Sequence, residues 1–312
     1  MNDTALPPVF VSHGSPMIAL EPGAAGAFLK ALGPDIDAEF GRPKAILAIS
    51  AHTTAPAAPT LLAAARHEAL YDFGAFDARL NRLRYDAAGA PALARRVASL
   101  LAAAQLAVHT LDRGGLDHGI WTALRYLYPR ADVPVLPLAF VPNQSPKQQF
   151  ALGAALAPLA EEGILILGTG SITHNLRRAF AAERRSLGGG DARPEAGSSA
   201  DISDISDIPQ IPEIPESAAF RAWMHERSAA RDWTALADYR RRAPHAVDMH
   251  PTDEHLLPWF VAAGAGGRAD APVRLHASVD MGVLGMDVYA FGPQAARLAR
   301  RFEPADAAEV QR

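Results

Sequence analysis

The chain has 312 residues, 49% of them hydrophobic, with a formal net charge of −4 and no cysteine. This charge gives no electrostatic footprint for nucleic acid, and no apolar stretch approaches the roughly 18 residues that a membrane span needs. The lack of cysteine excludes disulfides, thiolate metal sites and cysteine nucleophiles. The amino-terminal residues carry no signal-peptide pattern, so we expect a cytoplasmic enzyme that binds neither nucleic acid nor membrane.

Short apolar runs bounded by glycine, proline or polar residues predict the strands of a sheet. The runs show no strict alternation of apolar and polar residues, which is typical of strands that are covered on both faces. The predicted strands lie at Pro8–Ser12, Ala45–Ser50, Thr60–Ala64, Val133–Phe140, Ile164–Gly168 and Val273–Val279.

Longer segments with helical spacing of apolar residues separate these strands. The alternation predicts an α/β fold with a layered, mostly parallel central sheet flanked by helices, in a single domain that spans residues 1–312. The predicted helices lie at Gly23–Leu32, Pro91–Ala104, Ile120–Tyr128, Lys147–Glu162, Ala218–Ala229, Trp233–Arg241, Asp253–Ala263 and Gln294–Arg301.

One segment, at about residues 184–216, breaks this pattern. It contains three consecutive glycines and then a run in which isoleucine recurs every third residue among Ser, Asp and Pro. Low complexity without a helical or strand period predicts a flexible insertion within the domain. A polyproline-like arm that docks on a partner, or a functional lid, is the alternative.

Four histidines follow or border apolar runs in short polar motifs and predict one metal site. They are His13, His52, His174 and His255. Neutral imidazole is the commonest metal ligand in proteins, and the carboxyl ends of parallel strands converge on one crevice. We place His255 one turn into its helix, with Glu254 as the candidate if a carboxylate completes the set.

A fifth histidine, His118, lies in a glycine-flanked loop before a helix. Asp117 beside it could favour the protonated imidazole, but the pair could equally be a helix cap. No serine-nucleophile elbow or His-Glu-x-x-His motif is present. Two strand-end histidines and a third ligand suit either non-haem Fe(II) oxygen chemistry or a catalytic zinc, and composition does not separate the two.

Taken in order, six motifs resemble one family. They are Ser-His-Gly-Ser-Pro at His13, Ser-Ala-His at His52, Tyr-Asp-Phe-Gly-Ala-Phe at 71–76, Asp-His-Gly-Ile-Trp at His118, Gly-Ser-Ile-Thr-His-Asn-Leu at His174 and Pro-Thr-Asp-Glu-His-Leu-Leu-Pro at His255. The chain is similar to the DOPA-4,5-dioxygenase type of class III extradiol ring-cleaving dioxygenases over nearly its whole length, except for the insertion.

The resemblance implies particular roles. His13, His52 and His255 would bind Fe(II), with Zn(II) as another occupant, while His174 would be a further ligand or the base beside the metal. His118 would be the second acid–base group. The substrates would be a catechol, DOPA-like, and O2, and the product a muconic semialdehyde. Two positions depart from the family pattern, because Thr53 replaces a tryptophan and Asp77 a proline.

Two other functions compete with this interpretation. A zinc-dependent hydrolase could use the same architecture, because a fold does not determine its function. A metal-binding protein without catalysis, using the 184–216 arm to bind a partner, is the other. The sequence leaves the oligomeric state open.

Overall fold

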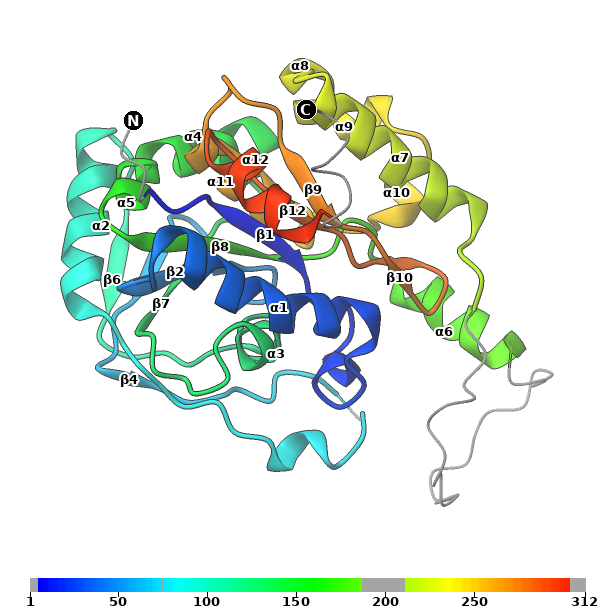
Figure 1. The fold of residues 1–312 in the computed structure, drawn as a ribbon, viewed down its shortest axis with the longest axis horizontal. Coiled ribbons are helices and arrows are strands. Elements are labelled where there is room, and N and C mark those ends of the chain that lie inside the picture. Colours follow the sequence, from blue (N-terminus) through cyan, green and yellow to red (C-terminus); the bar gives the residue numbers. More distant parts are fainter. Residues whose placement is uncertain (1–4, 75, 187–210, 304–312) are drawn as a thin grey trace, which may run out of the picture.

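The computed structural model describes residues 5–74, 76–186 and 211–303, and within them one large sheet organises the chain (Figure 1). Its eight strands run in the order β6-β3-β7-β2-β8-β1-β12-β9. Two further pairs, β4 with β5 and β10 with β11, form small ribbons. The strands are β1 (Val9–Ser12), β2 (Ala45–Ser50), β3 (Thr60–Leu62), β4 (Arg66–His67), β5 (Ala87–Ala88), β6 (His109–Leu111), β7 (Val135–Ala139), β8 (Ile164–Gly170), β9 (Val273–His276), β10 (Val279–Asp280), β11 (Leu284–Gly285) and β12 (Val288–Ala290).

The centre of the sheet is parallel and its flanks are mixed. Strands β7, β2, β8 and β1 pair in parallel, and β3 pairs in parallel with β6. The pairs β3–β7, β1–β12 and β12–β9 are antiparallel. The predicted α/β class with a layered central sheet is therefore confirmed. Antiparallel flanks were not expected, because short apolar runs carry no record of strand direction.

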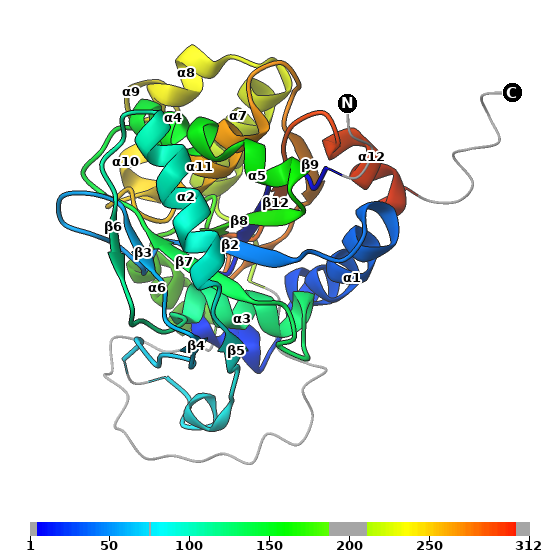
Figure 2. The same cartoon turned by 90° about the vertical axis from the view of Figure 1, so that its left-hand side faces the viewer.

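Helices cover both faces of the sheet (Figure 2). Alternate residues of β2 explain its unbroken apolar run, because Leu47 and Ile49 join one core cluster while Ile46 and Ala48 join the other. The first cluster includes residues of α2, α4 and α11, and the second includes residues of α1, α3 and α12. The helices are α1 (Gly23–Phe40), α2 (Pro91–Ala103), α3 (His118–Leu127), α4 (Pro146–Leu156), α5 (Pro158–Glu161), α6 (Leu176–Ser186), α7 (Pro215–Ala229), α8 (Trp233–Ala237), α9 (Tyr239–Arg242), α10 (Ala246–Met249), α11 (Leu257–Gly266) and α12 (Ala295–Ala299), with 3-10 turns η1 (Pro16–Ala19), η2 (Leu80–Arg82) and η4 (Arg300–Phe302).

Helix α1 is longer than predicted. We expected it to end at Leu32, before Gly33 and Pro34, but it continues to Phe40 with Pro34 inside it. A proline inside a helix costs about 3 kcal/mol. The extension buries Ile36 and Phe40, and this burial offsets the cost.

Proline also displaces two other predicted helix boundaries. The segment predicted as one helix over Lys147–Glu162 divides into α4 and α5 at Pro158. The placement of His255 one turn into a helix is wrong, because α11 begins at Leu257 with Pro258 in its first turn. A proline lacks the N–H that the interior of a helix needs but is tolerated in the first turn, so the helix begins just before Pro258 and His255 lies in the turn that leads into α11.

The predicted insertion is structured at both ends. Helix α6, which we did not predict, includes residues 184–186, and α7 begins at Pro215. Residues 187–210 of the predicted flexible segment lie outside the described residues. Within the described ranges, no helix is both long enough and apolar enough to cross a membrane.

Candidate active site

The histidine motifs meet at the carboxyl ends of three neighbouring parallel strands. His13 follows β1 and His52 follows β2, on either side of β8. The sheet register extends into the site, because the backbone N–H of His13 donates to the carbonyl of Gly170 at 2.9 Å. The turn before α11 completes the arrangement, since Ser171 donates its N–H to the carbonyl of His255 at 2.9 Å. A Cβ at Gly170 would lie 2.0 Å from that carbonyl oxygen, so only glycine permits this approach.

His13, His52 and His255 form a group that could hold a metal ion. Each offers a ring nitrogen, and these nitrogens all lie within 4.8 Å of one another. The Nε2 atoms of His13 and His52 are 3.1 Å apart, a separation compatible with bonds of about 2.1 Å to a common ion. The group contains three of the four residues that the sequence predicts as ligands.

Thr169 determines which nitrogen of His13 faces its neighbours. The Thr169 hydroxyl donates its single proton to the Gly119 carbonyl at 2.6 Å and lies 2.7 Å from His13 Nδ1. The hydroxyl must therefore accept from His13, so Nδ1 carries the proton and Nε2 keeps a lone pair. Nothing in the Gly-Thr-Gly run at 168–170 predicts this role, because the acceptor of the hydroxyl proton, Gly119, lies on α3, 50 positions away.

Glu254 has the same effect on His255. Its carboxylate oxygen lies 3.2 Å from Nδ1 of His255, and it also accepts a hydrogen bond from Thr252 at 2.8 Å. A carboxylate accepts, so His255 donates from Nδ1 and keeps the Nε2 lone pair. Nε2 is buried and has no hydrogen-bond partner within the described ranges. Glu254 therefore orients a candidate ligand and is not itself in the three-histidine group.

Burial keeps these histidines uncharged. It lowers the pKa of His13 and of His255 well below its usual value, and neighbouring histidines lower it further. Burial and the nearby His118 lower the pKa of His52 to about 4. The three rings are therefore neutral at pH 7, the protonation state in which imidazole binds a metal. Three converging neutral nitrogens, one of them buried without a partner, fit a divalent metal ion of the Fe(II) or Zn(II) type.

His118 lies against this group but has a carboxylate partner that we did not predict. Its ring centroid is 3.9 Å from that of His52. Asp72, in the loop before η2, accepts from both the backbone N–H and Nδ1 of His118 at 3.0 Å. Partial burial raises the pKa of Asp72, but the hydrogen bonds from His118 outweigh this effect and the net shift is downward.

Asp117, for which the sequence left open a role on His118 or as a helix cap, takes the second role. It caps α3 by accepting from the Ile120 N–H, and the hydroxyls of Ser50 and Thr53 both donate to it. The helix-cap interpretation is therefore correct. Burial raises the pKa of Asp117, while these two hydroxyls oppose the rise. Asp117 thus ties the loop that carries His52 to the start of α3.

His174 stacks on His255 and is not a member of the three-histidine group. The two ring centroids are 3.4 Å apart and the ring planes are nearly parallel, with an angle of 8° between them. The backbone N–H of His174 donates to the Met249 carbonyl at 2.8 Å. Burial and the nearby His250 lower the pKa of His174 to about 3, so its ring is also neutral at pH 7.

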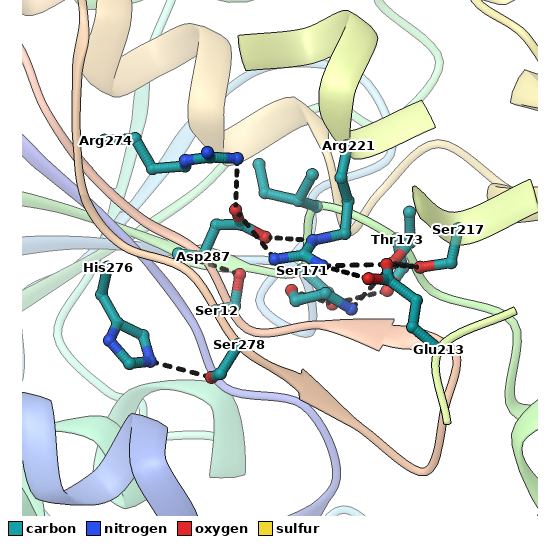
Figure 3. A network of polar contacts seen from close by, with 12 residues as sticks. Ser12, Ser171, Thr173, Glu213, Ser217, Arg221, Arg274, His276, Ser278 and Asp287 are labelled. Atoms are coloured by element: carbon teal, nitrogen blue, oxygen red, sulfur yellow. Dashed lines mark hydrogen bonds and ion pairs between the residues drawn. The ribbon is translucent and has the colours of Figure 1, made fainter. Parts of the chain in front are cut away.

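A second buried polar cluster holds the segments that precede His13 and His174 (Figure 3). Arg221 donates to Asp287 from Nε at 2.7 Å and to both carboxylate oxygens of Glu213 from Nη1, at 2.8 and 2.9 Å. Ser12 donates to the backbone carbonyl of Asp287 at 2.9 Å. Thr173 donates to the carbonyl of Val283 at 2.7 Å. We call Arg221, Asp287 and Glu213 the arginine cluster.

Comparison with known proteins gives a consistent picture. Residues 7–290 match the model of the family described as the catalytic LigB subunit of aromatic ring-opening dioxygenase. A 4,5-DOPA dioxygenase extradiol from Beta vulgaris is 34% identical over 284 residues, covering 90% of this chain and 95% of the relative. The protein of the same name from Portulaca grandiflora is 32% identical over 285 residues, covering 90% and 94%.

A solved structure shares the fold. The crystal structure of an uncharacterized protein from Escherichia coli K12 matches with a TM-score of 0.69 and 26% sequence identity. The match covers 92% of this chain and all of that one.

Proposed function

The chain belongs to the family of catalytic LigB subunits of aromatic ring-opening dioxygenases, and on that premise we propose that it cleaves the ring of a DOPA-like catechol with Fe(II) and O2. It is an extradiol dioxygenase, and its substrate is a small aromatic molecule. The proposed product is a muconic semialdehyde that carries both oxygen atoms. The observation that supports the proposal most is the convergence of three neutral, largely buried histidines beside two further histidines that can move protons.

In this proposal His13, His52 and His255 hold the metal. Bound Fe(II) would acidify the catechol hydroxyls and bring the ring and O2 together. Thr169 and Glu254 each keep a proton on Nδ1 of their histidine, so that Nε2 faces the ion. Fixing these tautomers before metal arrives removes a reorganisation that the site would otherwise need.

His118 and His174 are proposed as the proton-transfer groups. His174 is neutral at pH 7 and can accept a proton from a catechol hydroxyl. Its stacking on His255, outside the three-histidine group, favours a base over a fourth ligand. His118 lies against His52 and can accept a proton from the other catechol hydroxyl and return it to an oxygen atom of the opening ring.

The relatives and the aromatic residues beside His118 support the proposed substrate class. The relatives named above are called DOPA dioxygenases. Phe73 meets His118 edge-on, with ring centroids 5.6 Å apart, and also lies against Phe76 and the buried Trp121, which places a cluster of aromatic rings beside the site. Thr53 places a small side chain next to His52, where the resemblance leads us to expect tryptophan. We therefore propose a catechol whose side chain can differ from that of DOPA.

The test is anaerobic reconstitution with Fe(II), followed by a panel of catechols with and without an amino-acid side chain. We expect O2 uptake equal to catechol consumed and a yellow ring-opened product. Protein loaded with Zn(II), and His52→Ala beside the exposed control His109→Ala, are assayed in parallel. If the iron-loaded protein takes up no O2 with any catechol and the zinc-loaded protein shows hydrolase activity instead, the chain is a zinc hydrolase. Such an enzyme can use a three-histidine site of the same composition.

A further inference from the structure

The loop at residues 71–76 brings a carboxylate to the start of α3. Asp72 Oδ1 accepts two hydrogen bonds from His118, one from the backbone N–H and one from ring Nδ1, each at 3.0 Å. The first N–H groups of a helix have no acceptor within the helix, so Asp72 satisfies one of them while it holds the ring. Backbone and ring of His118 are thus fixed by the same oxygen atom.

The chemistry of the carboxylate determines the tautomer of His118. An ionised carboxylate only accepts hydrogen bonds, so Nδ1 of His118 must carry a proton and a neutral ring must keep its lone pair on Nε2. No hydrogen bond from Nε2 is formed to any residue in the described ranges. The side chain is only 7% exposed, between His52 at 3.9 Å and Phe73 at 5.6 Å between ring centroids.

Two alternatives are weaker, namely that Asp72 is a metal ligand and that Asp117 orients His118 in its place. Asp72, His118 and His52 also form a three-donor group, but Nε2 of His52 already faces His13 at 3.1 Å. Asp117 cannot replace Asp72, since Ser50, Thr53 and the Ile120 N–H occupy its carboxylate.

We propose that Asp72 is a positioning residue that keeps the proton of His118 on Nδ1 and presents Nε2 to the reacting catechol. This inference rests on the proposed function. When Nε2 accepts a proton from a substrate hydroxyl, the Nδ1–H stays on Asp72, and the carboxylate stabilises the imidazolium until Nε2 returns the proton to an oxygen of the opening ring.

The first arm of the test reads the tautomer directly. Nitrogen NMR of ¹⁵N-histidine-labelled, metal-free protein is recorded for the wild type and Asp72→Asn, with the His118 signals assigned by their loss in His118→Gln. We expect the Nδ1–H form in the wild type. A neutral amide oxygen is a weaker acceptor than a carboxylate, so Asp72→Asn should hold the proton on Nδ1 less strongly and shift the ring toward the Nε2–H form. Asp77→Asn, a change at a nearby carboxylate that pairs with Arg79 and not with His118, should leave the signals unchanged.

The second arm uses the iron-loaded enzyme. Asp72→Asn should lower kcat by roughly the 10²–10⁴-fold of lost acid–base catalysis, with iron content and catechol affinity retained. Asp72→Glu, which keeps a carboxylate, should have a kcat between those of Asp72→Asn and the wild type. Asp77→Asn should have the wild-type kcat. An Nε2–H tautomer in the wild type, or Asp72→Asn with the wild-type tautomer and kcat, would overturn the proposal. If no catechol is cleaved by the wild type, the proposed function fails, while the NMR arm still decides the role of Asp72.

Discussion

The arginine cluster and the three-histidine group are both buried and polar, and they lie at neighbouring parts of the sheet, but their atoms are satisfied differently. Arg221 is matched by two carboxylates, and the fully buried Asp287 receives hydrogen bonds from Arg221 and Arg274. In the histidine group, Nε2 of His255 has no partner within the described ranges, and the Nε2 atoms of His13 and His52 face each other. The neutral rings of the histidine group have lone pairs that can bind a ligand. The paired charges of the arginine cluster have partners within the protein and stabilise the structure.

The largest expected effect is on turnover at the two histidines beside the metal group. His174→Ala and His118→Ala should each lower kcat by roughly 10²–10⁴-fold, the usual contribution of acid–base catalysis, because each removes a group that moves a proton. Both variants should keep bound iron, measured by metal analysis beside catechol-dependent O2 uptake. Loss of iron in His174→Ala would make His174 a ligand, and normal turnover in both variants would contradict the acid–base roles.

Breaking the arginine cluster should instead affect stability. Arg221→Met removes the shorter of the two arginine contacts to the buried Asp287 and leaves its carboxylate, within the described residues, only the 3.5 Å contact from Arg274. Removing one partner of a buried ion pair typically costs about 3–5 kcal/mol. Urea unfolding of the metal-free protein measures the loss. Arg96→Met removes an exposed pair with Glu162 and should leave the midpoint unchanged. Equal midpoints for the two variants would mean that the arginine cluster does not stabilise the fold.

The smallest effect is expected at the Thr169 hydroxyl, which links His13 to the carbonyl of Gly119. Thr169→Val removes the acceptor that holds the proton on Nδ1 of His13, so metal affinity should fall by roughly 10–100-fold. Thr169→Ser keeps a hydroxyl and should bind metal like the wild type. Chelator competition gives the affinities, and equal values for Val and Ser would refute the tautomer assignment.

The sequence predicts the parts of the site that depend on strands. The sequence alone predicts that His13 and His52 lie close together, because neighbouring parallel strands end at the same edge of a sheet. The predicted position of His255 within a helix is wrong, because the helix begins only at Leu257, with Pro258 in its first turn. The motif does not encode the direction of the turn that precedes this helix.

Partners on loops were missed for a different reason. Asp117 is adjacent to His118 in the chain, yet an N-cap side chain bends toward the N–H groups of its own helix and away from the next residue. Asp72 reaches His118 across 46 positions because of a loop path that no periodicity encodes. The role of the Thr169 hydroxyl, on β8, also could not be predicted, since it depends on the approach of Gly119 from α3.

The central claim is that His13, His52 and His255 hold the catalytic metal, and anaerobic Fe(II) titration of His52→Ala beside wild-type protein tests it most directly. The account predicts that the wild type binds iron stoichiometrically and consumes O2 in proportion to the iron bound. In His52→Ala, bound iron and ring cleavage should disappear together, while the metal-free protein still unfolds cooperatively. Stoichiometric iron with full turnover in His52→Ala would contradict the claim.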